Sequence, residues 1–169
     1  MNSLKPMLQE EFMANPFNMI GKEWMLITAE KDGKANSMTA SWGGLGVMWG
    51  KNVVYIVVRK SRFTKTLIDG SDTFSLSFFD HEKYAKMLGY MGKVSGRDED
   101  KIKTADVTVE HYVGTPYIGE ASKVFICKKM CCQPISRDSF IDEKINETWY
   151  KDNDYHDLYI GEIIEILSK

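Results

Sequence analysis

The chain has 169 residues, 43% of them hydrophobic and 27% charged, which predicts one globular domain over residues 1–169 with a core of ordinary size. Its 22 basic and 24 acidic residues leave a net charge of −2, and no segment concentrates the basic ones, which argues against a nucleic-acid partner or an anionic membrane surface. No stretch approaches the ~20 apolar residues of a membrane span. Residues 1–6 open no apolar run, so we expect no membrane contact and a cytoplasmic location.

Hydrophobic periodicity predicts a mainly β fold with a few short helices. Strands are expected, in chain order, at residues 22–29, 36–42, 52–58, 74–79, 107–109, 123–127 and 157–166. The pair Asp32-Gly33 predicts a tight turn between the first two strands. The run at 52–58 is almost continuously apolar and β-branched, which indicates a strand buried on both faces.

Three helices are expected between these strands. Ser61 is the predicted N-cap of a short helix over residues 64–68, which Asp69-Gly70 would close. Asp80 is expected to cap a second helix, whose apolar positions 84, 87, 88 and 91 share one face. A weaker helical pattern runs from position 139 to 149. The glycine-rich connection 89–100 predicts a polar loop without a regular element.

The expected strand at 36–42 is unusually small and rich in hydroxyl groups, with Ser37, Thr39, Ala40 and Ser41 before Trp42. Each large side chain missing here forgoes core burial worth on the order of 1.5–3 kcal/mol, which is easier to explain if a ligand fills the space. Backbone amides and hydroxyls would then lie open beside an indole. The pattern favours a site for a flat cofactor, with packing as the alternative role of Trp42.

A second stretch, one hairpin later, has the composition of a phosphate site. Its guanidinium and hydroxyl groups come from Arg59, Ser61, Arg62 and Thr64. Guanidinium groups bind phosphate oxygens in pairs, and free backbone N–H groups at the start of the expected helix would share the contact. The alternative is that both arginines are surface cations paired with Asp69 or Asp72.

Other motifs exclude several kinds of site. The segment 43–46 and the pair Gly50-Lys51 form neither a G-x-G-x-x-G motif nor a P-loop, so a dedicated dinucleotide or nucleotide fold is not expected. Cys127, Cys131 and Cys132 fit neither a disulfide framework nor a common zinc pattern, and the histidines are scattered. We expect reduced thiols and no metal, with a redox role of the adjacent pair as the alternative.

The two stretches resemble the flavin reductase-like family, which includes the flavoredoxins. The blocks that extend the resemblance, in the order of the family, are residues 74–79, 92–101, 115–117 and 155–163. The resemblance covers most of the chain. It implies an FMN-binding split β-barrel with Greek-key-like connections, which works as a homodimer and holds FMN non-covalently at the dimer interface.

The resemblance also implies cofactor contacts beyond the two stretches, although loop 95–101 by itself would be an exposed charged turn. The expected contacts are Asn36, Ser37, Met38, Thr39, Ala40, Ser41, Trp42, Arg59, Ser61, Arg62, Thr64, Ser77, Phe78, Ser95, Gly96 and Lys101. No catalytic residue is assigned. His156 is the candidate, because relatives place a histidine of this block near the site and its side chain titrates near neutral pH.

The resemblance implies an oxidoreductase in which the flavin carries the chemistry. NAD(P)H is the expected electron donor and would bind loosely over the flavin. One alternative is a flavoredoxin-type electron-transfer protein, and a redox protein or a flavin-dependent monooxygenase is an implied partner. The other is a split-barrel module that binds haem, another tetrapyrrole or nothing, without redox turnover.

Overall fold

A computed structural model describes residues 4–169 of the chain. The strands are β1 (Lys5–Met7), β2 (Met25–Lys31), β3 (Lys34–Ala40), β4 (Gly43–Met48), β5 (Lys51–Arg59), β6 (Thr73–Phe78), β7 (Val109–Tyr112), β8 (Thr115–Ile118), β9 (Lys123–Pro134) and β10 (His156–Ser168). The α-helices are α1 (Pro16–Gly21), α2 (Phe63–Asp69), α3 (His81–Lys93), α4 (Lys101–Thr104) and α5 (Glu143–Trp149), with 3-10 turns η1 (Gln9–Glu11) and η2 (Arg137–Ser139). The predicted mainly β fold is confirmed.

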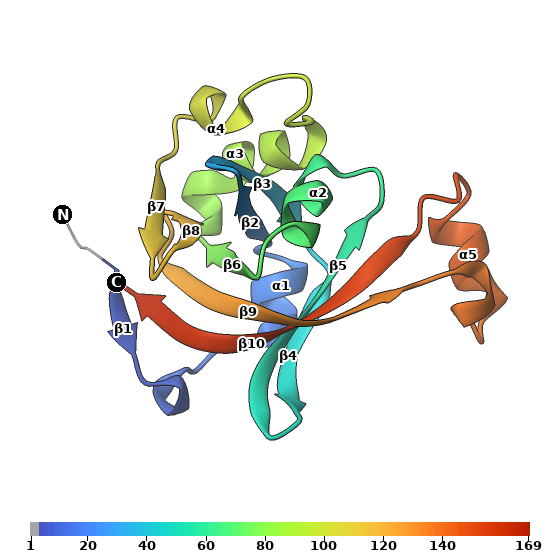
Figure 1. The fold of residues 1–169 in the computed structure, drawn as a ribbon, viewed down its shortest axis with the longest axis horizontal. Helices are drawn as coiled ribbons and strands as arrows, with labels where there is room; N and C mark the ends of the chain where they lie inside the picture. The colour runs from blue at the N-terminus through green and yellow to red at the C-terminus, as the bar shows by residue number, and fades with distance from the viewer. Residues whose placement is uncertain (1–3) are drawn as a thin grey trace.

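The main sheet has eight strands, which pair in the order β3-β2-β6-β9-β10-β5-β4, with β1 on the edge of β10. Strands β7 and β8 form a small second sheet. All pairings are antiparallel among the described residues. Figure 1 shows helices α2, α3 and α4 gathered on one side of the curved sheet. Helices α2, α3 and α4 all contact β3, and α2 follows β5 directly in the chain.

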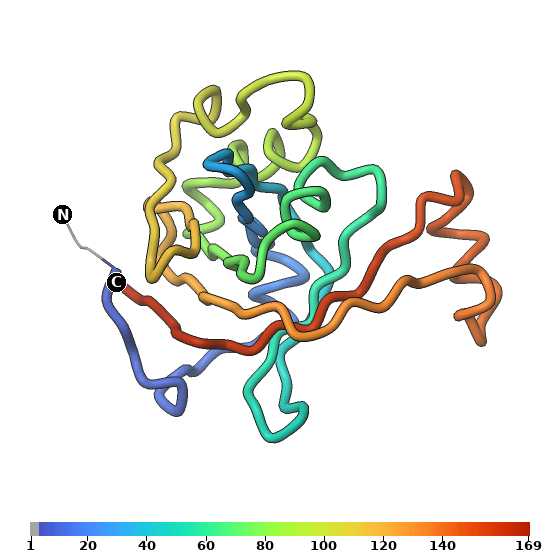
Figure 2. The backbone as a smooth tube through the Cα atoms, viewed as in Figure 1, coloured from blue at the N-terminus to red at the C-terminus, as the bar shows by residue number. Residues whose placement is uncertain are grey.

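Strands β9 and β10 run together past the edge of the body and separate again. The connection between them, residues 135–155, carries η2 and α5 and is called the arm below. The tube in Figure 2 shows the arm standing apart from the body and returning toward β5. A hollow lies between the arm and the body, because Trp149 of the arm and residues of β3 and β5 line the same cavity.

Two apolar clusters hold the described part of the chain together. The first joins α1 and α2 to the sheet, and the second joins α3 to the small sheet through Leu88, Met91 and Ile118. Strand β5 is only partly as predicted. Val54 and Val58 are fully buried, whereas Val57 is partly exposed because it faces the hollow.

Several boundaries differ from those expected. Helix α2 begins at Phe63 with Arg62 as its N-cap, so the prediction that Ser61 caps it is wrong. Asp80 caps α3 as predicted, but this helix continues to Lys93, and the predicted loop from position 89 is helical for five more residues. The expected helix 139–149 is a 3-10 turn at 137–139 followed by α5.

Three strands, β1, β4 and β8, were missed because their sequences carry weak signals. Strand β4 contains the glycines at 43, 44 and 46, yet it pairs along its whole length with β5. Strand β8 contains a proline and is short. The expected strand 107–109 begins only at Val109. No helix from residue 4 to residue 169 is long and apolar enough to cross a membrane.

Gly161 is a steric requirement of the sheet. It lies in β10 where the register with β9 shifts, and an added Cβ would lie 2.6 Å from Cζ of Phe74 and 3.3 Å from Cβ of Cys127. Gly161→Ala is therefore expected to lower the free energy of unfolding by about 1–3 kcal/mol, because a buried ring would have to move. Denaturant unfolding measures this change.

Gly89→Ala is the matched control, because Gly89 lies inside α3 with no atom within 4 Å of the added Cβ. It is expected to leave the protein as stable, or to stabilise it by up to ~1 kcal/mol, through the better helix propensity of alanine. Equal stability of Gly161→Ala and the wild type would contradict the steric account.

Candidate functional site

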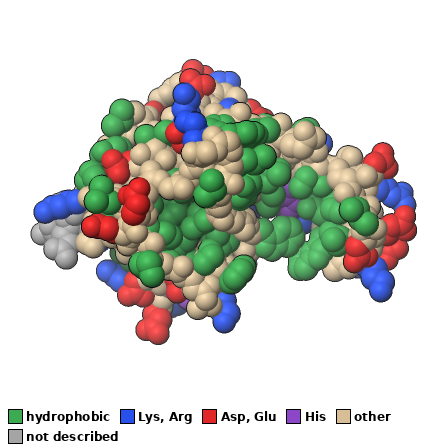
Figure 3. Space-filling view, turned by 90° about the horizontal axis from the view of Figure 1, so that it is seen from below, with side chains coloured by type: hydrophobic (Ala, Val, Ile, Leu, Met, Phe, Trp, Pro, Cys, Tyr) green, Lys and Arg blue, Asp and Glu red, His purple; other side chains and the backbone are tan. Residues whose placement is uncertain are grey.

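The end of β3, the end of β5 and the arm line an open cavity of about 260 Å³, called the ring cavity below. Of the expected contacts it brings together Met38, Thr39, Ala40, Ser41, Trp42, Arg59, Arg62 and His156. Figure 3 shows a hollow between the body and the arm, lined mostly by hydrophobic side chains, with a histidine in it. The two stretches singled out in the sequence therefore do converge.

A second cavity of about 240 Å³, called the anion cavity below, adjoins the first. It is lined by the expected contacts Asn36, Ser61, Arg62, Thr64, Ser95, Gly96 and Lys101, together with Arg97. Arg62 lines both cavities, so the two form one continuous site. Each alone is smaller than the roughly 300–1,000 Å³ of most ligand sites, whereas the pair together falls within that range.

Four cations line the anion cavity, Arg62, Lys93, Arg97 and Lys101, and none of them forms an ion pair among the described residues. Arg62 donates from Nη1 to the carbonyl of Gly92 at 2.7 Å, and Lys101 donates from Nζ to the carbonyls of Met91 and Val94 at 2.8 and 3.0 Å. Lys101 is only 2% exposed. A negatively charged ligand would supply the missing partner.

Burial shifts Arg62 and Lys101 toward their neutral forms. Desolvation and the nearby Arg59 guanidinium lower the pKa of Arg62. Desolvation and the Arg62 guanidinium lower the pKa of Lys101 to about 8. Arg62 keeps its charge at any physiological pH, whereas Lys101 titrates close to it.

A tight contact holds the 94–100 loop against the barrel. Asn36 Nδ2 donates to Thr64 Oγ1 at 2.7 Å and so joins β3 to α2. A Cβ on Gly96 would overlap the Asn36 side chain and lie 2.8 Å from Cδ1 of Phe63. Only glycine allows this approach to Asn36 and Phe63. Contact of Gly96 with a ligand stays a prediction.

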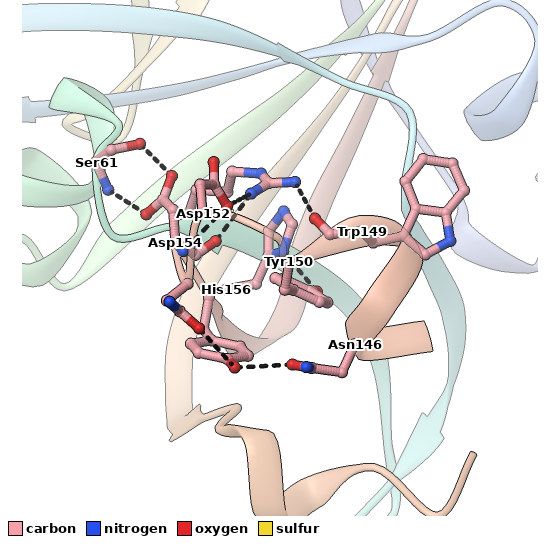
Figure 4. A network of polar contacts seen from close by, with 10 residues as sticks. Ser61, Asn146, Trp149, Tyr150, Asp152, Asp154 and His156 are labelled. Atoms are coloured by element: carbon pink, nitrogen blue, oxygen red, sulfur yellow. Dashed lines mark hydrogen bonds and ion pairs between the residues drawn. The ribbon is translucent and has the colours of Figure 1, made fainter. Parts of the chain in front are cut away.

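Arg59 and Ser61, two of the expected phosphate contacts, hold the arm (Figure 4). Arg59 donates to the carbonyl oxygens of Trp149 and Asp154, both at 2.9 Å, and lies 3.5 Å from the carboxylate of Asp152. The backbone N–H and hydroxyl of Ser61 both donate to the carboxylate of Asp154. Contact of either residue with phosphate stays a prediction, and it would require these bonds to open.

The alternative, in which these arginines pair with Asp69 or Asp72, is wrong. Arg59 is paired with Asp152 and Arg62 with a carbonyl, whereas Asp69 is paired with Lys65 at 2.7 Å. Trp149 and Asp154 gave no signal in the sequence, because the arm has only weak periodicity and meets the barrel through contacts distant along the chain.

Ser37, Ser77 and Phe78, three more expected contacts, are buried and line neither cavity. Ser37 Oγ is hydrogen-bonded to Thr28 Oγ1 at 2.7 Å, and Ser77 Oγ accepts from the backbone N–H of Ile118. Phe78 packs with its ring centroid 5.4 Å from that of Phe125. Strand β6 is buried on both faces at these positions, and Ser37 is buried in β3, so the three side chains contact the core and neither cavity.

His156 is a buried, neutral side chain in the wall of the ring cavity. It is 7% exposed, and its ring lies 5.3 Å from that of Trp42. Desolvation and the Arg59 guanidinium lower the pKa of His156 to about 4. It therefore carries no charge at neutral pH.

The cysteines and carboxylates form no metal site in the part of the chain that the structure describes. Cys127, Cys131 and Cys132 are free thiols, of which Cys127 is buried and Cys132 exposed. Burial raises the pKa of Cys127, so this thiol is unreactive.

Comparison with known proteins identifies the family. The family described as "Flavin reductase like domain" matches residues 18–168, and the chain belongs to it. No curated protein matches the chain.

Solved structures agree in fold. An FMN-binding domain of a flavin reductases-like enzyme from Shewanella baltica superposes with a TM-score of 0.71 at 17% identity, covering 99% of this chain and 78% of that one. Flavoredoxin from Methanosarcina acetivorans gives 0.67 at 23%, covering 98% and 75%. An NADH:FAD oxidoreductase from Streptomyces globisporus gives 0.61 at 19%, covering 85% and 74%. The expected mainly β fold of the flavin reductase-like family is confirmed.

The depressed pKa of His156 predicts acid sensitivity. Between about pH 6.5 and pH 4 the unfolded chain binds a proton at His156 that the folded chain does not, so the free energy of unfolding falls as the pH is lowered through this window. The expected loss is on the order of 1–3 kcal/mol. Denaturant unfolding at several pH values measures it.

His156→Gln removes this titration, so its stability should depend less on pH across the same window. Superimposable pH profiles of the variant and the wild type would contradict the assignment.

Proposed function

We propose that the protein is an FMN-binding oxidoreductase that accepts electrons from NAD(P)H, in the manner of a flavin reductase. The observation that carries this proposal is the continuous site in which a ring cavity joins, at Arg62, a cavity lined by four cations that form no ion pair among residues 4–169. Membership of the flavin reductase-like family and the likeness to FMN-binding proteins support the choice of flavin. The likeness to an NADH:FAD oxidoreductase supports a nicotinamide donor.

The residues present fit FMN. A phosphate monoester carries about −1.5 to −2 charges at pH 7, which Arg62 and Lys101 would balance. The flat ring would lie against the end of β3, beside Trp42 and His156, where small side chains leave the backbone accessible. When bound, the flavin would supply the hydride and electron chemistry. The chain would bind and orient it, and would shield it from water with the arm.

Among the described residues, the ring cavity is lined by no carboxylate or lysine, and its arginines keep their protons at neutral pH. His156 is neutral, and Arg59 is held by carbonyls of the arm. We therefore assign no catalytic acid or base. NAD(P)H would enter the open hollow between the arm and the body, which needs no dinucleotide fold.

A flavoredoxin-type electron carrier is the second candidate. The indole of Trp149 is 52% exposed and packs edge-on against that of Trp42, 5.0 Å away. The pair would connect the ring cavity to the surface, where a redox protein or a flavin-dependent monooxygenase could dock. This arrangement favours exchange of electrons with a protein partner.

We also propose a homodimer with the flavin at its interface. The hairpin of β4 and β5 exposes Val47 and Trp49, and α1 exposes Phe17. Helix α1 contacts β4, and exposed apolar side chains that lie side by side are typical of surfaces that another chain covers. Sedimentation at two protein concentrations tests this proposal, and a monomer at both would contradict it.

The first experiment is an absorbance spectrum of the purified protein, followed by anaerobic addition of NADH or NADPH to the FMN-loaded form. Rapid bleaching of the flavin bands would support the reductase and identify the donor. A yellow protein that neither nucleotide bleaches would favour the carrier. A protein that takes up no FMN would overturn the flavoprotein proposal and favour a binding module without redox turnover.

Arg62→Ala is expected to weaken FMN binding about 10- to 100-fold, the effect of losing a charged hydrogen bond. Fluorescence titration of FMN measures the dissociation constant. Arg137→Ala, which removes the same side chain from η2 outside both cavities, is the matched control and should bind FMN as the wild type does. Equal affinities of the two variants would argue against the anion cavity.

The affinity for FMN should fall as the pH rises above about 8. The free protein loses the Lys101 proton there, whereas a bound phosphate would raise the pKa of Lys101 and retain it. The dissociation constant is then expected to rise by up to about tenfold per pH unit, until the pKa of the complex is reached.

Lys101→Met should bind FMN more weakly and without this pH dependence. The phosphate itself finishes its ionisation near pH 6, below the window of interest. A wild-type affinity that stays constant from about pH 7.5 to 9.5 would contradict the role of Lys101.

A further inference from the structure

Tyr150 and His156 form a buried hydrogen-bonded pair behind the ring cavity (Figure 4). The phenolic oxygen of Tyr150 lies 2.8 Å from Nδ1 of His156. Tyr150 is 5% exposed, and its ring is stacked on that of Tyr155, with the centroids 5.0 Å apart. Both members of the pair are therefore held in place by packing.

The pairing decides which ring nitrogen of the neutral imidazole carries the proton. If Nδ1 carried it, Nδ1–H would donate to the Tyr150 oxygen, and the phenolic proton would have no acceptor among residues 4–169. A buried donor left unsatisfied costs about 1–3 kcal/mol. If Tyr150 donates instead, its proton is satisfied and the imidazole is protonated at Nε2.

The other ring nitrogen is open to the ring cavity. His156 lines this cavity, and Tyr150 does not. Nε2 of His156 makes no hydrogen bond to any residue from 4 to 169, and it is not among the buried unsatisfied atoms of that part of the chain. An Nε2–H group would thus face whatever occupies the cavity.

The charges around the pair keep the imidazole neutral. The Arg59 guanidinium lies over the Tyr150 ring, with Cζ 5.3 Å from its centroid, and opposes a second positive charge on His156. Asp154 and Asp157 act in the opposite direction, but Arg59 and burial outweigh them. The group presented to the cavity is consequently an uncharged donor.

We propose that Tyr150 is a positioning residue that fixes His156 in the Nε2–H tautomer, so that a neutral imidazole N–H group donates to a planar heterocyclic ligand in the ring cavity. The acceptor would be a carbonyl oxygen or a ring nitrogen of that ligand. The ligand class rests on the proposed function, whereas the tautomer is a property of the protein alone.

The first test observes the tautomer directly, by ¹⁵N NMR of the imidazole in the ligand-free protein at neutral pH. The wild type should show a protonated Nε2 and an unprotonated, hydrogen-bonded Nδ1. Tyr150→Phe should shift the ring toward a mixture of tautomers. Protonation of Nδ1 in the wild type, or an unchanged spectrum in Tyr150→Phe, would overturn the proposal.

Tyr155→Phe is the matched control. It removes a hydroxyl from the same aromatic stack, and that hydroxyl is bonded to Asn146 at 2.7 Å and not to His156. A merely structural role of the stack would make Tyr150→Phe and Tyr155→Phe alike in the NMR spectrum. The proposal requires that only Tyr150→Phe alters the imidazole signals.

The second test asks whether Nε2 serves the ligand. The amide nitrogen of His156→Gln falls near the position of Nε2, whereas that of His156→Asn falls near Nδ1. His156→Gln should keep the wild-type affinity for FMN to within about threefold, and His156→Asn should lose about tenfold, the effect of one neutral hydrogen bond. Equal losses in both variants would contradict a donor at Nε2.

The two tests separate the proposals. If the wild type binds no FMN, the proposed function fails, and the NMR spectrum still decides the tautomer. If FMN binds but the tautomer is wrong, only the positioning role of Tyr150 fails.

Discussion

The antiparallel pairing of β10 with β5 places His156 opposite Arg59, and the site depends on this register. The pairing continues past the strand ends, where Lys60 donates its N–H to the carbonyl of Tyr155 and Ser61 is bound by Asp154. The arm is thereby brought back to the very stretch that leads into α2. A slip of one residue would turn the imidazole to the other face of the sheet and would separate the walls of the ring cavity.

The anion cavity depends on a different element, the last turn of α3. The carbonyls of Met91 and Gly92 accept hydrogen bonds from Lys101 and Arg62. The C-terminal end of a helix carries partial negative charge, so it offsets part of the unfavourable burial of two cations. The remaining imbalance is what a bound anion would relieve. Arg62 and Lys101 thus affect both the stability of the protein and its affinity for an anion.

Local patterns were sufficient for much of the sheet and for the convergence of the two polar stretches. The extension of α3 was not predictable, because glycine normally indicates a loop. Gly92 is needed for a different reason, since its missing Cβ would lie 3.3 Å from Cβ of Thr39 on β3. Glycine is required both where two elements approach closely and in a flexible turn, so the sequence alone does not distinguish the two.

The contacts of the arm could not be predicted from the sequence either. Trp149 ends a weak helical pattern and Tyr150 follows it, and nothing local shows that they contact Trp42, just after β3, and Arg59 of β5. Ser61 was expected to face an anion and does so, but the anion is the carboxylate of Asp154, 93 residues further along the chain. The residue type of Ser61 correctly indicated a donor to an anion, whereas the identity of that anion depended on the tertiary fold.

The polar bonds that hold the arm converge on Arg59 and Ser61, while the barrel has its own apolar clusters. The apolar clusters thus stabilise the sheet and its helices, whereas the arm shapes the entrance to the ring cavity. Substitutions in α5 can accumulate without disturbing the packing of the barrel. In evolutionary terms, the arm is a region where a lineage can change what it admits to the cavity while the scaffold stays constant.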